Sequence, residues 1–325
     1  RSFRTRIEKE VLPWDHDAGV VSNIRGFVRT PESEYEIVVG ISSSEKKVSC
    51  NGRTLSSLGL LWGKMNAVLF APGDLSVVQG PPGIRRRFLD MEGSQIDPGY
   101  LYQLQKFHRI LKQRNAVLKT GFDEQDLSES LTVWDEQIIP PAAKVFTYRR
   151  WFLKILTKEA KNTYGELAEK GENLELEYDN FIGNNDPALN DAAVEDIYRK
   201  ILVKNRSEDV YRGTTSCGPH RDDFRILLGG RDSRTFGSQG QQKSAIISLR
   251  LAEIRMMEEY TGHTPLLLLD DIASELDERR RKHFLSRLKP GYQTFLTGTE
   301  SEAIKESVAI DKTIHISGGQ ISTIT

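Results

Sequence analysis

Short apolar runs near the start of the chain have the spacing of β-strands. Between residues 19 and 48 they alternate with polar residues and are interrupted at Thr30-Pro31 and by the polar segment 42–47. This pattern predicts an antiparallel sheet. The sequence CNGR at residues 50–53 is typical of a tight turn, and the apolar segment AVLF at residues 67–70 predicts a short buried strand. We expect the antiparallel sheet to join a parallel sheet that contains this strand.

The pattern changes to a helical period at residue 84 and keeps it to about residue 211. Within residues 100–120, positions three and four apart form a seam for a partner helix: Leu101, Leu104, His108, Leu111, Asn115 and Leu118. We interpret His108 and Asn115 as core polar residues that set the register of this seam rather than as ligands.

A second helix is predicted over residues 142–170, where apolar residues again recur at helical spacing. The pair Pro140-Pro141 is predicted to break the helix that begins near Trp134, because proline lacks the N–H group that a helix interior needs. Residues 172–186 are expected to form a strand and a loop, and residues 192–204 a short helix.

The segment from residue 236 to residue 277 carries most of the candidate chemistry. It begins with FGSQGQQ at residues 236–242, a Gly/Ser-rich loop that runs into a predicted helix. The free N–H groups and the positive dipole end of such a helix can hold a phosphate. The apolar run at residues 265–269 then predicts a strand buried on both faces, and it ends in Asp270-Asp271.

Asp270 and Asp271 are expected at the carboxyl end of a buried parallel strand, where open α/β sheets place their ligands. One carboxylate can hold Mg²⁺ while the other orients an attacking water, as in phosphoryl transfer. The alternative is a solvated strand end without chemistry. We favour phosphoryl transfer because a phosphate loop, an acidic strand end and a helix N-cap at Ser274 follow one another.

Composition and charge restrict the remaining possibilities. The 325 residues carry a net charge of −1, so nucleic-acid binding requires locally concentrated charge. The two cysteines, Cys50 and Cys217, lack CxxC spacing, which argues against a disulfide framework or a zinc site. Without an apolar run of about eighteen residues or a secretory leader, the sequence predicts a cytoplasmic protein with no membrane partner.

Residues 84–119 hold eight basic and three acidic residues. Arg109, Lys112 and Lys119 lie along one predicted helical stripe, which suits the phosphates of DNA. We take this stripe, with Arg85 and Arg86, as candidate DNA contacts. A solvated face or ion pairs within the protein explain the charge equally well.

Several segments, in this order, resemble the RecF family of bacterial recombination ATPases, which is related to ABC and SMC heads. They are PGDL at 72–75, RRRFLD at 85–90, LKQRN at 111–115, GPHRDD at 218–223, FGSQGQQ at 236–242 and LLLDD at 267–271. The role of His220 and Arg221 in the fourth segment stays open between a hinge, a nucleotide-sensing turn and a structural turn.

The resemblance implies an α/β fold, an ABC-ATPase-like head with a mixed parallel and antiparallel sheet (lobe I) and an inserted, mainly helical lobe II. Residues 1–83 and 212–325 would form lobe I, and residues 84–211 lobe II. The implied function is ATP-dependent DNA binding in gap repair and replication restart. The implied cofactors are ATP and Mg²⁺. The implied partners are DNA with single-/double-strand junctions or gaps, RecR and RecO, RecA, and a second copy of the chain in an ATP-dependent homodimer.

The resemblance also assigns roles to individual residues. It makes Asp270 the Mg²⁺ ligand and Asp271 the residue that orients water. It places Ser238, Gly240 and Gln241 against the γ-phosphate of ATP held by the other protomer, and Asp277 at the dimer interface. The alternative for Ser238 is a cap that serves only its own helix, and the alternative for Asp277 is a first-turn carboxylate that interacts with the helix dipole.

The sequence departs from the family at its phosphate-binding loop. No GxxxxGK[ST] pattern occurs in it, and the closest stretch, GSQGQQKS at residues 237–244, lacks the spacing. We expect that the first strand, phosphate loop and helix of the family are missing, in which case the chain is a fragment or does not bind ATP normally. The alternative function is therefore a non-enzymatic DNA- or partner-binding module.

We predict that the chain as given does not hydrolyse ATP. Without a phosphate loop, the β- and γ-phosphates lack a backbone cradle and its lysine, and a metal at Asp270 cannot replace them. Phosphate release by the purified chain, with and without DNA, tests this expectation. ATP hydrolysis that is stimulated by DNA would contradict it.

Overall fold

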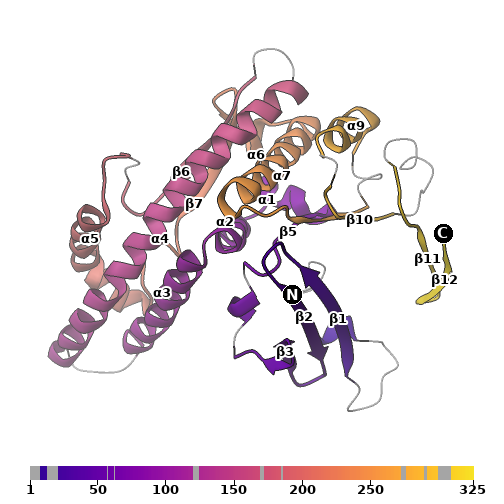
Figure 1. Cartoon of the computed structure of the whole chain (residues 1–325). Coiled ribbons are helices and arrows are strands. Elements are labelled where there is room, and N and C mark those ends of the chain that lie inside the picture. The colour runs from indigo at the N-terminus through magenta and orange to yellow at the C-terminus, as the bar shows by residue number, and fades with distance from the viewer. Residues whose placement is uncertain are drawn as a thin grey trace.

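The computed structural model is described over ten segments of the chain (Figure 1). These are residues 8–12, 21–56, 58–61, 63–119, 124–168, 172–183, 186–271, 276–288, 291–298 and 309–325. Strands occupy both ends of the chain and long helices its middle, as the change of period in the sequence predicts. In the described residues no helix is long and apolar enough to cross a membrane.

The first strands form the predicted antiparallel sheet, in the order β1-β2-β3-β4. Their bounds are β1 Ser22–Arg29, β2 Glu34–Ile41, β3 Lys46–Cys50 and β4 Arg53–Thr54. The tight turn between β3 and β4 is confirmed. Asn51 and Gly52 both have positive φ, at 50° and 76°, as a two-residue hairpin turn of this type requires.

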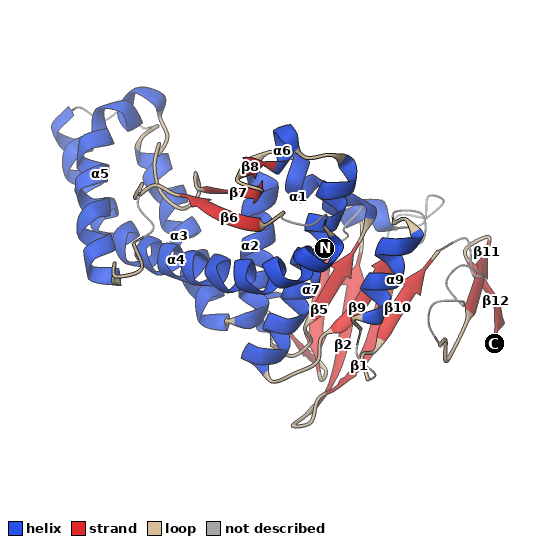
Figure 2. Cartoon of the chain, turned by 90° about the horizontal axis from the view of Figure 1, so that it is seen from above, coloured by secondary structure: helices blue, strands red, loops and turns tan. Residues whose placement is uncertain are grey.

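A second sheet is parallel and has the order β10-β9-β5 (Figure 2). Its strands are β5 Ala67–Phe70, β9 Leu266–Asp270 and β10 Thr294–Thr297. The central strand β9 is covered on the face that Leu267 and Leu269 occupy, since these side chains are 0% and 1% exposed. The predicted mixture of parallel and antiparallel sheets in an α/β fold is therefore confirmed.

Two helices accompany the parallel sheet. α7 (Gln239–Thr261) packs against β5, and α9 (Glu278–Ser286) packs against α7. Phe284 of α9 meets Phe70 of β5 edge to face, with ring centroids 4.2 Å apart. The apolar cluster so formed holds the sheet in place directly beneath the carboxyl ends of its strands.

The middle of the chain forms four long helices. They are α2 (Pro82–Ile96), α3 (Pro98–Val117), α4 (Glu124–Leu167) and α5 (Asp191–Arg212). α4 is the common support, because α3, α5 and α7 all pack against it. Figure 1 shows α4 running the length of this part of the molecule. α5 extends beyond the predicted range 192–204 at both ends.

The prediction that Pro140-Pro141 breaks a helix is wrong, because α4 continues through both residues. A proline inside a helix costs about 3 kcal/mol or more, since it removes a hydrogen bond and its ring crowds the preceding turn. The flanking residues Ile138, Ile139 and Ala142 are all 0% exposed. Burial on this scale offsets the loss of backbone hydrogen bonds.

The predicted seam on α3 is partly confirmed. Leu104, Leu111 and Leu118 are buried, and they face α4 and α5. His108 is exposed, so its interpretation as a core polar residue is wrong. Asn115 is half-buried and accepts hydrogen bonds from the N–H and the hydroxyl of Thr215, at 2.8 and 2.7 Å. It therefore fixes the loop after α5 rather than a helix–helix register.

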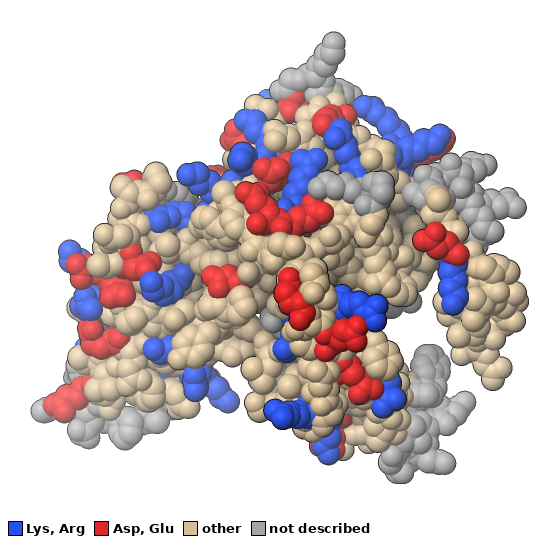
Figure 3. Space-filling view, in the orientation of Figure 1, with Lys and Arg blue, Asp and Glu red and all other residues tan. Residues whose placement is uncertain are grey.

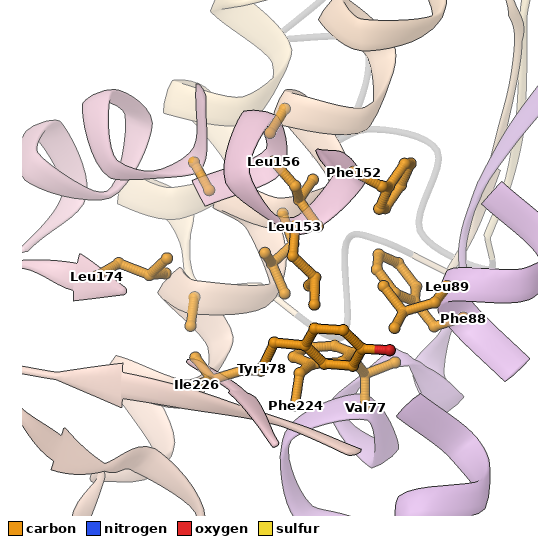
Figure 4. Close-up of a cluster of buried hydrophobic side chains, with 14 of the residues drawn as sticks. Val77, Phe88, Leu89, Phe152, Leu153, Leu156, Leu174, Tyr178, Phe224 and Ile226 are labelled. Carbon is orange, nitrogen blue, oxygen red and sulfur yellow. The ribbon is translucent and has the colours of Figure 1, made fainter. Parts of the chain in front are cut away.

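A third sheet joins the two stretches of chain that flank α5. β6 (Leu174–Asp179) pairs antiparallel with β7 (Asp223–Leu228), which pairs with β8 (Arg231–Asp232). The strand expected within residues 172–186 is confirmed. Figure 4 shows its inner face, where Leu174, Tyr178 and Phe224 pack against Leu153 of α4. The predicted end of lobe II at residue 211 thus lies, in the sequence, between β6 and β7, which pair with each other.

The remaining elements are short. They are η1 Glu8–Val11, η2 Leu58–Leu61, η3 Pro72–Leu75, α1 Ser76–Gln79, α6 Ser233–Phe236 and the hairpin β11 Ile314–Ser317 with β12 Gln320–Ile324. The hairpin turns at Gly318-Gly319, which both have positive φ. Cys50 and Cys217 are free thiols, in agreement with the absence of a disulfide framework.

Arg114 joins α3, α4 and α5 through buried ion pairs. Its Nε donates to Asp135 of α4 and its Nη1 donates to Asp209 of α5, each at 2.7 Å. Burial opposes the charge of Arg114, but these two carboxylates raise its pKa above the ordinary value. The guanidinium is therefore charged at every working pH, and it is a fixed part of the core.

We predict that Arg114→Met lowers the free energy of unfolding by about 3–5 kcal/mol, because it leaves the fully buried carboxylate of Asp209 without its cation. The matched control is Arg109→Met, an exposed position on the same helix, for which a change within about 0.5 kcal/mol is expected. Urea unfolding of both variants measures the difference. Equal midpoints would contradict the structural role of Arg114.

Candidate functional site

Asp270 is the last residue of β9, and it lies where the three parallel strands end. It pairs in register with Thr297, the last residue of β10. The Thr297 hydroxyl donates to Asp270 Oδ1 at 2.6 Å and so fixes the orientation of the carboxylate. The end of a central parallel strand is the usual place for a ligand in such sheets. The expectation for the position of Asp270 is met.

Asp271 turns the chain away from the sheet. Its φ of 52° lies in the left-handed region, which residues other than glycine seldom adopt. Its N–H donates to the Thr297 carbonyl at 3.0 Å, which extends the strand pairing by one step. Asp271 is half-buried beside Asp270, so both carboxylates lie at the same strand end. Strain of this kind is typical of positions at functional sites.

A small cavity of about 50 Å³ adjoins Asp270. Its wall combines the loop after β5, the second turn of α7 and the segment before α9: Phe70, Ala71, Pro72, Asp74, Leu75, Lys243, Ile246, Ile247, Asp270 and Leu276. This volume suits an ion with part of its water shell rather than a whole nucleotide. Lys243 is the residue that sequence reasoning missed, although a lysine directly after a Gly-rich loop was a usable signal.

Asp74 of the PGDL segment is held by a buried arginine of α7. Arg250 donates to both oxygens of Asp74, with Nη2 at 2.7 Å and Nε at 3.1 Å. The same guanidinium pairs with Glu253 of α7 at 2.8 Å and with Glu92 of α2 at 3.3 Å. The wall of the cavity is thereby connected to two helices by charge-assisted hydrogen bonds.

Ser238 caps α7, as one of the two interpretations of the sequence predicted. Its hydroxyl accepts from the N–H of Gln241 at 3.2 Å, and the Gln241 side chain accepts from the N–H of Ser238 at 2.8 Å. This reciprocal capping box closes the loop. The Gln241 amide also donates to Glu172 at 2.5 Å, which anchors the loop to the strand β6 region. The hydroxyl of Ser238 keeps its own proton to donate.

Gly240 and Asp277 are linked through Arg280. A side chain on Gly240 would come within 2.9 Å of Arg280 Nη2. Arg280 in turn pairs with Asp277 and donates from Nε to Ser244 of α7 at 2.9 Å. Asp277 also caps α9 by accepting from the N–H of Arg280 at 3.0 Å. The loop at 236–242 and the segment around Asp277 therefore form one surface. Ser274 and Glu275 lie outside the described residues.

The metal chemistry available at this site is limited. Among the described residues, no group of three or more His, Cys, Asp or Glu side chains is placed to hold a metal ion. Asp270 and Asp271 offer carboxylates at one strand end, and Mg²⁺ commonly takes one or two carboxylates and completes its shell with water and phosphate oxygens. The residues fit an ion that arrives with a nucleotide.

The basic candidates divide into two groups. Arg85 is buried, and its guanidinium donates to both oxygens of Asp223 at 2.8 and 2.7 Å. Its selection as a DNA contact is wrong, because this ion pair and the carbonyl of Gly80 occupy its donors. Arg109, Lys112 and Lys119 are exposed. On the face shown in Figure 3, basic and acidic side chains are interspersed.

The GPHRDD segment forms a rigid turn between α5 and β7. Asp222 accepts from the Tyr178 hydroxyl at 2.5 Å and from the N–H of Phe181 at 2.9 Å. Burial raises the pKa of Asp222 to about 6. His220 contacts the Thr215 carbonyl through Nε2 at 3.0 Å, and burial lowers its pKa to about 4, so the imidazole is neutral near pH 7. These bonds favour the structural turn among the three roles left open.

Comparisons with known proteins agree with this geometry. No protein-family model matches the sequence. A protein of Bacillus mycoides named "DNA replication and repair protein RecF" is 36% identical over 323 residues, which is 99% of this chain and 85% of that protein. A protein of the same name from Lysinibacillus sphaericus is 38% identical over 323 residues, 99% of this chain and 86% of that protein.

Solved structures give the same result. The structure of the recombination mediator protein RecF with ATP, in the RecFOR pathway, matches with a TM-score of 0.88 and 32% identity. The match covers 99% of this chain and 84% of that chain. A structure of the same protein named with ATPrS matches with a TM-score of 0.86. Both the sequence and the backbone therefore agree with these proteins over almost all of this chain.

Proposed function

The chain belongs to the RecF family of DNA replication and repair proteins, and from this we propose that it acts as a nucleotide-dependent DNA-binding dimer in recombinational repair. The proposal extends to its partners: gapped or junction DNA, and RecO and RecR in the loading of RecA. Support for the nucleotide comes from the neighbours solved with ATP and ATPrS. Support for a dimer comes from the arrangement of the site itself.

The observation that carries the dimer proposal is the separation of two sets of residues. Asp270 lines the cavity at the strand ends, whereas Ser238, Gly240 and Gln241 are not part of its wall. Ser238 is exposed at the free end of α7, where the N–H groups and dipole favour an anion. A loop that faces outward in this way suits a phosphate bound to a second copy of the chain.

We propose separate roles for the two carboxylates. Asp270, oriented by Thr297, would take the Mg²⁺ ion, and the small cavity would hold part of its water shell. Asp271, whose own backbone has a positive φ directly after Asp270, would orient an attacking water. Bound ATP with Mg²⁺ would supply a γ-phosphoryl group that is open to attack. Lys243, on the same wall as Asp270, would add positive charge near the phosphates.

The Ser238 loop provides the test of a shared site. In a chimera that joins a GxxxxGK[ST] phosphate loop to this chain, we predict that Ser238→Arg leaves ATP binding by the monomer within about twofold of the parent, because Ser238 faces away from its own nucleotide site. ATP-dependent dimerisation is expected to be lost, since a bulky side chain covers the N-terminus of α7. Equilibrium ATP binding and analytical ultracentrifugation measure the two effects.

The control for charge and bulk is Thr235→Arg, an exposed position three residues before Ser238. It should dimerise like the parent chimera. If Ser238→Arg instead abolished ATP binding by the monomer and left dimerisation intact, the loop would be a local phosphate cap, and the shared-site proposal would be abandoned.

The exposed basic residues of α3 and its end are our proposed contacts to the DNA backbone. Arg109 and Lys112 are three positions apart and so share a helix face. Arg86 remains a candidate, although its Nη1 already donates to the Asp222 carbonyl at 2.7 Å. The alternative function, a DNA- or partner-binding module without ATP turnover, would use the same surface.

We predict that the double variant Arg109→Gln, Lys112→Gln weakens duplex DNA binding and makes the slope of log affinity against log salt shallower by about 1–2, because each lost phosphate contact removes about 0.9 from it. Fluorescence anisotropy over a salt series measures the slope. The matched control is Lys200→Gln, Lys204→Gln, two exposed positions on α5. An equal change in both double variants would mean that binding depends on net charge alone.

A further inference from the structure

A second and larger cavity lies between α2, α3, α4 and the turn that contains His220. Its volume is about 410 Å³, which is within the range of about 300–1,000 Å³ that is common for small-molecule sites. None of the residues assigned to ATP or Mg²⁺ lies on its wall. The cavity therefore needs an explanation of its own.

One part of the wall is apolar and the other is charged. Met91, Leu101 and Leu104 supply the apolar part. Arg86 and Arg87 lie on the charged part, together with Asp90. A free phosphate would leave the apolar surface unused, and a purely apolar ligand would leave the cationic surface unused. A ligand with a flat apolar body and a phosphate uses both.

The charged part of the wall is fixed in place. Arg149, also on the wall, is buried and donates to Asp90 at 2.7 Å and to the Pro219 carbonyl at 2.6 Å. Arg86 is held through its bond to the Asp222 carbonyl. Burial, and then the neighbouring Arg149, lower the pKa of Arg86, while Asp223, Asp222 and Asp90 oppose this shift.

Along α3, the proposed DNA contacts Arg109 and Lys112 follow directly after the residues that line the cavity. Leu101, Leu104 and His108 line it from one side of that helix. Lys112 is four residues after His108 and continues the same face. A strand whose phosphates follow Lys112 and Arg109 would therefore arrive at the cavity, where the exposed imidazole of His108 offers a ring for stacking.

We propose that this cavity binds one unstacked nucleotide, with the phosphate at Arg86 and Arg87, the base against Met91, Leu101 and Leu104, and Asp90 accepting from an amino group of the base. The inference rests on the proposed nucleic-acid binding and specifies the unit that is bound. Taking a base out of the stack costs a few kcal/mol in a duplex and least in a single strand. The site therefore selects unpaired nucleotides.

The test uses a single-stranded oligonucleotide that carries 2-aminopurine, whose fluorescence rises when the base leaves the stack. Saturating protein is expected to raise the fluorescence. Met91→Glu, which places a carboxylate on the wall at a position 40% exposed, should abolish the rise and weaken single-strand binding by about tenfold. Duplex affinity should stay within about twofold.

Two matched controls accompany this variant. Met65→Glu makes the same change at a position 43% exposed that is not on the wall, and it should behave like the parent. Arg87→Gln should weaken single-strand binding severalfold, whereas Arg231→Gln, also exposed and off the wall, should not. Urea midpoints equal to the parent's establish that the variants are folded.

Competition with deoxyadenosine monophosphate and with deoxyadenosine identifies the source of the ligand. Direct binding of deoxyadenosine monophosphate, measured by calorimetry without an oligonucleotide and abolished by Met91→Glu, supports the site even if the chain binds no strand, and so separates this inference from the proposed function. If deoxyadenosine displaced the oligonucleotide as strongly as deoxyadenosine monophosphate does, the proposed role of the arginines would be overturned. The site itself would be overturned if the parent protein bound DNA without a rise in fluorescence. It would also be overturned if Met91→Glu weakened duplex and single-strand binding equally.

Discussion

The buried guanidinium of Arg250 is the interaction on which the arrangement of sheet and helices depends. It bonds Asp74 after β5, Glu92 of α2 and Glu253 of its own helix α7. Burial penalises its charge, but the three carboxylates more than compensate and raise its pKa well above the ordinary value. Burial, and then the nearby Glu92, raise the pKa of Glu253 well above its ordinary value. Removing such a cation leaves buried acids unpaired, at a cost of about 3–5 kcal/mol.

Local pattern was sufficient to predict the elements that surround the candidate site. The apolar run before Asp270, the turn at Asn51-Gly52 and the cap at Ser238 each depend on a few neighbouring residues. Their periods and turn residues determine conformation without reference to distant parts of the chain. The order of the six short segments from PGDL at 72–75 to LLLDD at 267–271 indicated the family, because several short signals in one fixed order are far more specific than any one of them.

The predictions that failed depended on distant partners. Arg85 looks like a surface cation in the sequence, but its partner Asp223 is 138 positions away. Pro140-Pro141 looks like a helix stop, but burial of the surrounding residues of α4 outweighs the local penalty. His108 occupies a core position by spacing and an exposed one in the fold, because the neighbouring elements leave a cavity there. Spacing alone does not reveal which side of a helix a neighbour leaves open.

α2 lines the larger cavity and is bonded to the wall of the smaller one through Arg250, and this restricts how either cavity can change. Glu92 on this helix bonds Arg250, which holds the wall of the Asp270 cavity through Asp74. Arg86 and Met91, within two turns of Glu92, form the wall of the larger cavity. A helix of 15 residues with intact hydrogen bonds moves as one body. Displacing it at one cavity therefore moves the wall of the other, unless the ion pairs of Arg250 with Glu92 and Asp74 break, and both pairs are buried and costly to separate.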